Sequence, residues 1–165
     1  MGNTIKSDFS LAKFIPIMNT SMCLLGLDYG EKKIGVAISD TRKVISSNHK
    51  MILNKRATHY INEIREVCQK RNVGGIVIGL PLNMNGSEGP RCQSTRSFAE
   101  KLQKAGLPPT AFWDERLSTL AAENILLEAN TSRKKRTRVV DIVAANIILQ
   151  GALDRLQNAL QKDMQ

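Results

Sequence analysis

Residues 24–40 read LLGLDYGEKKIGVAISD, and this stretch decides the fold. Two apolar runs flank the polar segment DYGEKK, and a continuous apolar run is typical of a strand that is buried on both faces of a sheet. The chain turns at Gly30, so we expect the two runs to form an antiparallel pair of strands. Asp28 stands where the first run stops, which places a carboxylate at the end of a buried strand.

The rest of the chain alternates between strand and helix patterns. Composition and the spacing of apolar residues predict strands over 44–53, 74–81 and 110–116, and helices over 57–72, 92–105, 118–129 and 139–162. A basic connector at 133–138 precedes the last helix. The order β-β-β-α-β-α-β-α predicts an α/β fold with a mixed five-stranded sheet and helices on both faces.

The chain of 165 residues is long enough for one domain with a substantial core, which we expect over residues 22–165. Residues 1–21 have no apolar segment like that of a signal peptide, and we interpret them as a loosely ordered N-terminal extension. The three cysteines lack C-x-x-C spacing, which favours free thiols over a disulfide framework or a zinc site and fits a reducing cytoplasm. No apolar run approaches the length of a membrane span.

The chain is strongly basic, with a formal net charge of +9 and a pI of about 9.7. A basic domain favours an anionic partner, nucleic acid ahead of a membrane surface, although charge alone fits a merely solubilising surface equally well. Aromatic residues make up 4% of the chain. This disfavours single-strand binding by stacked bases and favours backbone and shape recognition of structured RNA or branched DNA. Trp113 is expected in the core.

Asp28 has two explanations. The sequence Asp-Tyr-Gly can form an Asx-type turn, and the ends of central strands in α/β sheets are also where ligands bind. On Asp28 alone, the turn is the better explanation.

Asp141 changes that balance. On a helical wheel it lies in the middle of an apolar stripe with Ala144, Ala145, Ile148 and Ala152, so it is expected to face the sheet. A capping role for backbone N–H groups explains its place near the start of the helix, but not its facing. A buried carboxylate aimed at a strand end that carries another carboxylate needs a cation between them.

A third carboxylate comes from Asp114 and Glu115, at the end of the last strand. Adjacent strand residues point to opposite faces, so one can face the site while the other pairs with Arg116 or caps the next helix. Glu115 is preferred because its longer side chain can reach across from a strand that does not neighbour the first. An ordinary strand-end salt bridge is the better explanation for either residue alone.

Together, Asp28, Glu115 and Asp141 predict a site for Mg²⁺ or Mn²⁺, since hard cations prefer oxygen ligands. Two such ions can activate water and stabilise the leaving oxygen in phosphodiester hydrolysis. Acidic groups on the first strand, on a later strand end and on the last helix of such a sheet are the plan of the ribonuclease H-like nucleases.

Four segments of the chain closely resemble the YqgF family of RuvC-like, ribonuclease H-fold proteins. They are LDYGEKKIGVAISD (27–40), IVIGLPLNMNGSEGP (76–90), DERLST (114–119) and VDIVAANIILQ (140–150). The resemblance runs from about Met22 to about Leu156. It implies a hydrolase that resembles Holliday junction resolvases and acts on the 5′ end of precursor 16S rRNA, with the family's acidic positions at Asp28, at Asp114 or Glu115, and at Asp141.

One departure from better-studied nucleases of this fold concerns the strand that neighbours the first. Those nucleases place a carboxylate after it, whereas here the strand ends GLPLNMNG and the first carboxylate is Glu88. The metal site is therefore expected to have fewer carboxylate ligands than usual.

Basic side chains near these segments are candidates for phosphate contact. They are Lys32, Lys33, Arg91, Arg96, Arg116 and the run Arg133, Lys134, Lys135, Arg136 and Arg138. The backbone N–H groups of GLPLNMNGSEGP can approach a phosphate, and a plain strand-to-helix connection rich in turn formers is an equally good explanation. A charge run is usually only a solvated face, but this one lies beside the proposed site.

Three functions remain open at this point. The protein is expected to cut precursor rRNA on a ribosomal subunit, to cut a four-way DNA junction, or to bind RNA without catalysis as an assembly factor. Junction cutting calls for a homodimer, whereas the other two are compatible with a monomer. ATP hydrolysis is disfavoured, because 165 residues leave no room for a second domain to close over a nucleotide.

Overall fold

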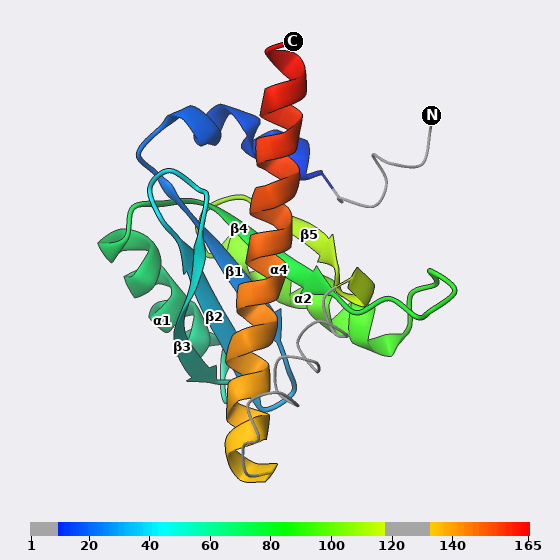
Figure 1. Cartoon of the computed structure of the whole chain (residues 1–165). Helices are drawn as coiled ribbons and strands as arrows, with labels where there is room; N and C mark the ends of the chain where they lie inside the picture. Colours follow the sequence, from blue (N-terminus) through cyan, green and yellow to red (C-terminus); the bar gives the residue numbers. More distant parts are fainter. Residues whose placement is uncertain (1–9, 118–132) are drawn as a thin grey trace.

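The computed structural model of the chain describes residues 10–117 and 133–165, with only the backbone course for residues 117 and 133–142. Five strands form one sheet in the order β3-β2-β1-β4-β5 (Figure 1). Their bounds are β1 Cys23–Tyr29, β2 Lys33–Ser39, β3 Ser46–Leu53, β4 Val73–Leu80 and β5 Thr110–Asp114. β1–β2 and β2–β3 are antiparallel, whereas β1–β4 and β4–β5 are parallel. This confirms the predicted mixed five-stranded α/β sheet.

Helices cover both faces of the sheet, as predicted. α1 (Ala57–Lys70) and α2 (Pro90–Lys104) pack on one face, where Ile64 and Phe98 join Leu25 in a core cluster. α4 (Arg133–Asp163) crosses the other face (Figure 1), where Leu149 packs with Leu24. Successive β1 residues therefore alternate between the two cores, because strand side chains point to opposite faces.

Glycine lets α4 lie directly on β1. A Cβ added to Gly26 would lie 2.6 Å from Leu149 Cβ and 3.0 Å from the Ala145 carbonyl oxygen. Trp113 is 9% exposed and belongs to the same core, which confirms its prediction as a core residue. In the described parts of the chain, no helix is long and apolar enough to cross a membrane. The three cysteines are free and buried.

The N-terminal segment differs from the prediction. Residues 1–21 were expected to be loosely ordered, but Leu11–Asn19 form a 3₁₀ helix, η1. Its residues Leu11, Phe14 and Met18 are buried in the α4-side core, and the Phe14 ring lies against Gly75 of β4. The expectation was wrong here because these apolar residues are held by distant partners on the sheet and on α4.

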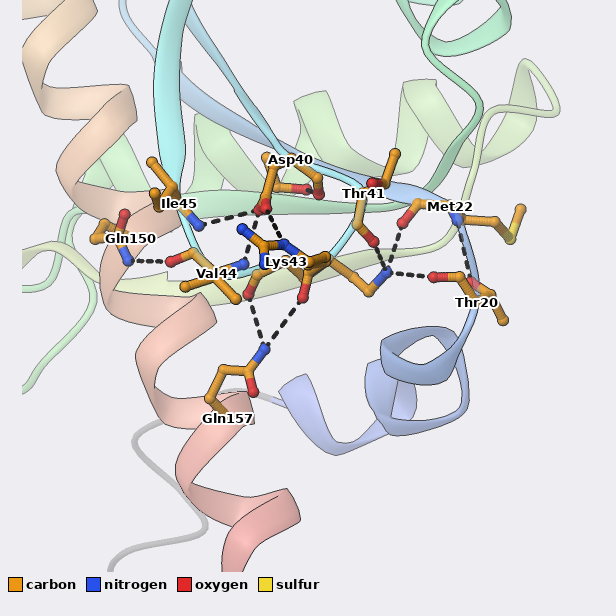
Figure 2. Close-up of polar contacts among 11 residues, drawn as sticks. Thr20, Met22, Asp40, Thr41, Lys43, Val44, Ile45, Gln150 and Gln157 are labelled. Atoms are coloured by element: carbon orange, nitrogen blue, oxygen red, sulfur yellow. Dashed lines mark hydrogen bonds and ion pairs between the residues drawn. The ribbon is translucent and has the colours of Figure 1, made fainter.

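A buried lysine connects this segment to the β2–β3 turn (Figure 2). The ammonium of Lys43 donates to the carbonyl oxygens of Thr20 at 2.7 Å, Met22 at 2.8 Å and Thr41 at 2.6 Å. Burial lowers the pKa of the Lys43 ammonium, against the opposing effect of the Asp40 charge. The three carbonyls replace the water that the ammonium would otherwise bind.

The same turn holds α4 in place. Gln150 of α4 accepts a hydrogen bond from the Ser46 N–H at 2.8 Å and donates to the Val44 carbonyl at 2.9 Å. About two turns further on, Gln157 donates to the Lys43 carbonyl at 3.1 Å (Figure 2). These contacts fix where α4 crosses the sheet.

Two further differences concern the chain before α4. The basic connector predicted at 133–138 is instead the start of α4, which begins at Arg133. Arginine and lysine are good helix formers, so the run extends the helix rather than preceding it. The helix predicted over 118–129 lies outside the described residues.

Candidate active site

The structure brings Asp28 and Glu115 together. Asp28 is the penultimate residue of β1, and Glu115 directly follows β5. Because β1, β4 and β5 are parallel, their carboxyl ends meet at one edge of the sheet. The two carboxyl groups share a hydrogen bond, although β4 lies between their strands.

Gly79 of β4 makes this meeting possible. A Cβ at Gly79 would lie 2.5 Å from Glu115 Oε1 and 2.8 Å from Glu115 Cγ. The Glu115 side chain thus crosses β4 over a residue that has no side chain of its own. The sequence has no carboxylate directly after β4, and the Glu115 carboxylate, which follows β5, lies over Gly79 of that strand instead. The sequence reasoning missed Gly79, whose signal was a glycine inside an otherwise apolar strand.

Asp114 points elsewhere. Its side chain is almost fully buried and pairs with Arg116, whose Nη2 lies 2.6 Å from Oδ2 and whose Nε lies 3.0 Å from Oδ1. The Arg116 backbone N–H also donates to Asp114 Oδ1 at 3.0 Å. Of the two neighbouring acids, Glu115 is the one that reaches Asp28, and Asp114 forms the strand-end salt bridge.

The two facing carboxyl groups perturb each other's protonation. Burial raises the pKa of Asp28, against the opposing effects of the hydrogen bond from Glu115 and of the Arg91 charge. Burial, the Asp28 charge and their shared hydrogen bond raise the pKa of Glu115 to about 8, while Arg91 lowers it. Near neutral pH the pair therefore shares a proton, with Glu115 as the donor. Without that proton, the pair needs a nearby positive charge.

These oxygens are the donors that a hard divalent cation prefers, so the pair fits Mg²⁺ or Mn²⁺. Among the side chains that the structure describes, no three Asp, Glu, His or Cys residues gather closely enough to hold a metal ion. The third predicted ligand, Asp141, lies on α4 one turn before Ala145, and its side chain is outside the description. The predicted inward stripe is confirmed at Ala145, Ile148 and Ala152, which are all buried, whereas Ala144 is half-buried.

The basic residues divide into groups with different partners. Arg91 lies in the first turn of α2, and its charge acts on both Asp28 and Glu115. Arg96 pairs with Glu88, and Arg116 pairs with Asp114. Lys32 is exposed in the β1–β2 turn. The start of α4 is formed by Arg133, Lys134, Lys135 and Arg136, for which the structure describes the backbone alone.

The β4–α2 loop uses much of its backbone internally. The N–H groups of Leu82, Asn83 and Gly86 donate to the carbonyl oxygens of Leu80, Ser87 and Asn83, respectively. The Ser87 N–H donates to Asn85 Oδ1 at 3.0 Å. Because these four N–H groups already have acceptors within the loop, the segment is better explained as a strand-to-helix connection than as a phosphate-binding loop.

Comparisons with known proteins identify the family to which the chain belongs. The family model described as "RuvX: Holliday junction resolvase" matches residues 22–155. A protein of Ruegeria sp. (strain TM1040), named "Putative pre-16S rRNA nuclease", is 55% identical over 135 residues, which are 82% of this chain and 86% of that protein. A protein of Roseobacter denitrificans with the same name is 50% identical over 149 residues, 88% of this chain and 91% of that protein.

Among solved structures, the large terminase nuclease from thermophilic phage G20c is similar with a TM-score of 0.51 and 9% identity. The match covers 78% of this chain and 80% of that chain, and it shows a shared fold. The sheet order, the facing carboxyl groups and these relatives lead to one assignment. The chain belongs to the RuvX family of Holliday junction resolvase-like proteins and is a hydrolase of the nuclease class.

Proposed function

We propose that this nuclease is metal-dependent, cuts structured nucleic acid, and processes the 5′ end of precursor 16S rRNA on a ribosomal subunit in the cytoplasm. The observation that carries the proposal is the Asp28–Glu115 pair, which spans β4 over Gly79 and shares a proton. Two facing, largely buried carboxyl groups are stabilised by a nearby positive charge, which Mg²⁺ or Mn²⁺ would supply. The names of the two relatives support the RNA substrate.

We assign the catalytic roles from the Asp28–Glu115 pair and from the place of Asp141 in the sequence. Asp28, Glu115 and Asp141 would hold one or two divalent ions, which lower the pKa of an attacking water and offset charge on the phosphate. Glu115 loses the proton that it shares with Asp28 when positive charge enters the site. Arg91 supplies a fixed positive charge next to the pair, and we assign it to the phosphate of the cleaved bond.

Substrate binding is assigned to basic residues around this edge of the sheet. Each phosphate that a lysine or arginine neutralises adds to affinity and to its salt dependence. The proposed set is Lys32, Arg91, Arg116, Arg133, Lys134, Lys135 and Arg136. Arg116 serves in this set through its partly exposed guanidinium, which is anchored by Asp114.

A four-way DNA junction is the second candidate substrate, because the matching family model is described as a Holliday junction resolvase. A symmetric junction requires two active sites related by a two-fold axis, hence a homodimer. An rRNA end has no such symmetry, and a monomer suffices for it.

The test is a paired cleavage assay on a precursor 16S rRNA fragment and a four-way DNA junction, with Mg²⁺, with Mn²⁺ and with EDTA. Asp28→Asn is expected to reduce cleavage by at least about 10²- to 10³-fold, since it removes a charge at the reacting centre. Asp163→Asn, an exposed carboxylate at the end of α4, is the matched control and is expected to cleave normally.

Cleavage of the RNA alone supports the proposal, and cleavage of the junction alone replaces it with the second candidate. Tight binding without cleavage under every metal condition would reduce the protein to a noncatalytic assembly factor. Thermal unfolding of both variants separates a lost function from a lost fold.

A further inference from the structure

The loop between β4 and α2 carries a fully exposed apolar side chain. Met84 is 89% exposed, and Figure 1 shows this loop standing out from the body of the molecule. Burying an apolar side chain is favourable, so Met84 is available for contact with a bound partner.

Hydrogen bonds within the loop hold Met84 at the tip of a tight turn. The Gly86 N–H donates to the Asn83 carbonyl at 2.8 Å, and Gly86 has a φ of +84°, which glycine adopts without strain. Asn83 Nδ2 donates to Ser87 Oγ at 2.9 Å, and that hydroxyl donates to Asn85 Oδ1 at 2.6 Å. The turn is therefore closed by its own side chains, with Met84 at its second position.

A single arginine connects this turn to the candidate active site. Arg116 Nη1 donates to the Met84 carbonyl at 3.2 Å, while the rest of the same guanidinium is locked on Asp114. Arg116 directly follows Glu115, the carboxyl group that reaches Asp28. Met84 thus projects from a turn that is tied to the reacting edge of the sheet.

We propose that Met84 is a base-contacting residue that inserts between two bases of the bound nucleic acid next to the cleaved phosphodiester. Apolar side chains, methionine among them, act as wedges that unstack a base step in nucleic-acid complexes. The thioether is unbranched and polarisable, so it adapts to different base faces. Four of the loop's N–H groups have acceptors within the loop, and its exposed apolar tip offers a contact surface. This inference rests on the proposed nuclease function.

The experiment measures base unstacking directly. The precursor 16S rRNA fragment and the four-way DNA junction each carry a single 2-aminopurine, whose fluorescence rises when it is unstacked, at successive positions in separate samples. The protein carries Asp28→Asn, so that the substrate stays intact. Binding is expected to raise the fluorescence at least about twofold at one position, because a wedge separates only one base step.

Variants at two equally exposed methionines provide the contrast. Met84→Ala in the same background is expected to abolish the rise, whereas Met84→Leu retains it. Met164→Ala is the matched control, since Met164 is 88% exposed at the far end of α4. In the active protein, Met84→Ala is expected to lower kcat/KM about tenfold, with no change in melting temperature, because the truncated side chain touches only substrate.

The outcomes separate this inference from the proposed function. Cleavage by the active protein, without a fluorescence rise at any position or with an equal rise in Met84→Ala, overturns the wedge and leaves the nuclease standing. A Met84-dependent rise without cleavage supports the wedge and overturns the nuclease. Failure to bind either substrate overturns both.

Discussion

Replacing Glu115 by glutamine is expected to remove the loss of stability that the metal-free protein shows as pH rises. The pKa of Glu115 is about 8, against an ordinary value of 4.5, so between these values the folded state holds a proton that the unfolded state releases. Wild-type stability from this group is therefore complete below pH 4.5 and is lost as pH rises through 8. Glutamine stays neutral and still donates a hydrogen bond to Asp28, so it carries no such loss.

The size of the effect follows from the pKa difference. About 3.5 units at 1.36 kcal/mol per unit correspond to an upper limit of about 5 kcal/mol. Glu115 is partly exposed, and solvent screening reduces this limit. The interval from pH 5 to pH 8.5 covers about 2.8 of these units, or about 4 kcal/mol at most, so after screening Glu115→Gln should gain about 2 to 4 kcal/mol of stability relative to the wild type.

Urea unfolding followed by circular dichroism, in EDTA at pH 5, 7 and 8.5, measures the difference. Glu100→Gln, an exposed glutamate on α2, is the matched control and should follow the wild-type profile. Parallel profiles of Glu115→Gln and the wild type would refute the shared proton. They would also remove the electrostatic reason for a cation between Asp28 and Glu115.

Three further changes test the surroundings of the site. Gly79→Ala should destabilise the protein by about 1–3 kcal/mol through overpacking, and it should also displace Glu115. The control Gly26→Ala crowds only Leu149 and Ala145. Only Gly79→Ala should therefore lose more nuclease activity than its loss of stability explains. Lys43→Met leaves three carbonyl oxygens without their donor and should cost about 1–3 kcal/mol in urea unfolding, while Arg42→Met, next to it and 81% exposed, should cost nothing measurable. Glutamine at Arg133, Lys134, Lys135 and Arg136 should flatten the plot of log affinity against log salt by about 0.9 per lost phosphate contact, and an unchanged slope would place this run outside the interface.

The local sequence pattern was sufficient for the elements of the fold and for two of the candidate acids. Alternating apolar runs and helical spacing placed the five strands, and the apolar stripe of the last helix identified the buried face of α4. Asp28 and Glu115 could be named because a carboxylate at the end of a buried strand is visible in the sequence. These features depend on neighbours within a few residues, so a single chain read by itself reveals them.

Other features depend on residues that are distant in the sequence, and only the tertiary structure decided them. The sequence favoured Glu115 over Asp114 for its reach, but how it meets Asp28 required the empty space over Gly79 on another strand, and the pairing of Asp114 required the direction of Arg116. The η1 helix is held by α4 and the sheet, although its own sequence predicted loose order. Lys43 is buried because carbonyl groups of a distant segment replace its water. Periodicity records which face of an element is apolar, whereas the partner that meets that face is determined only when the whole chain packs.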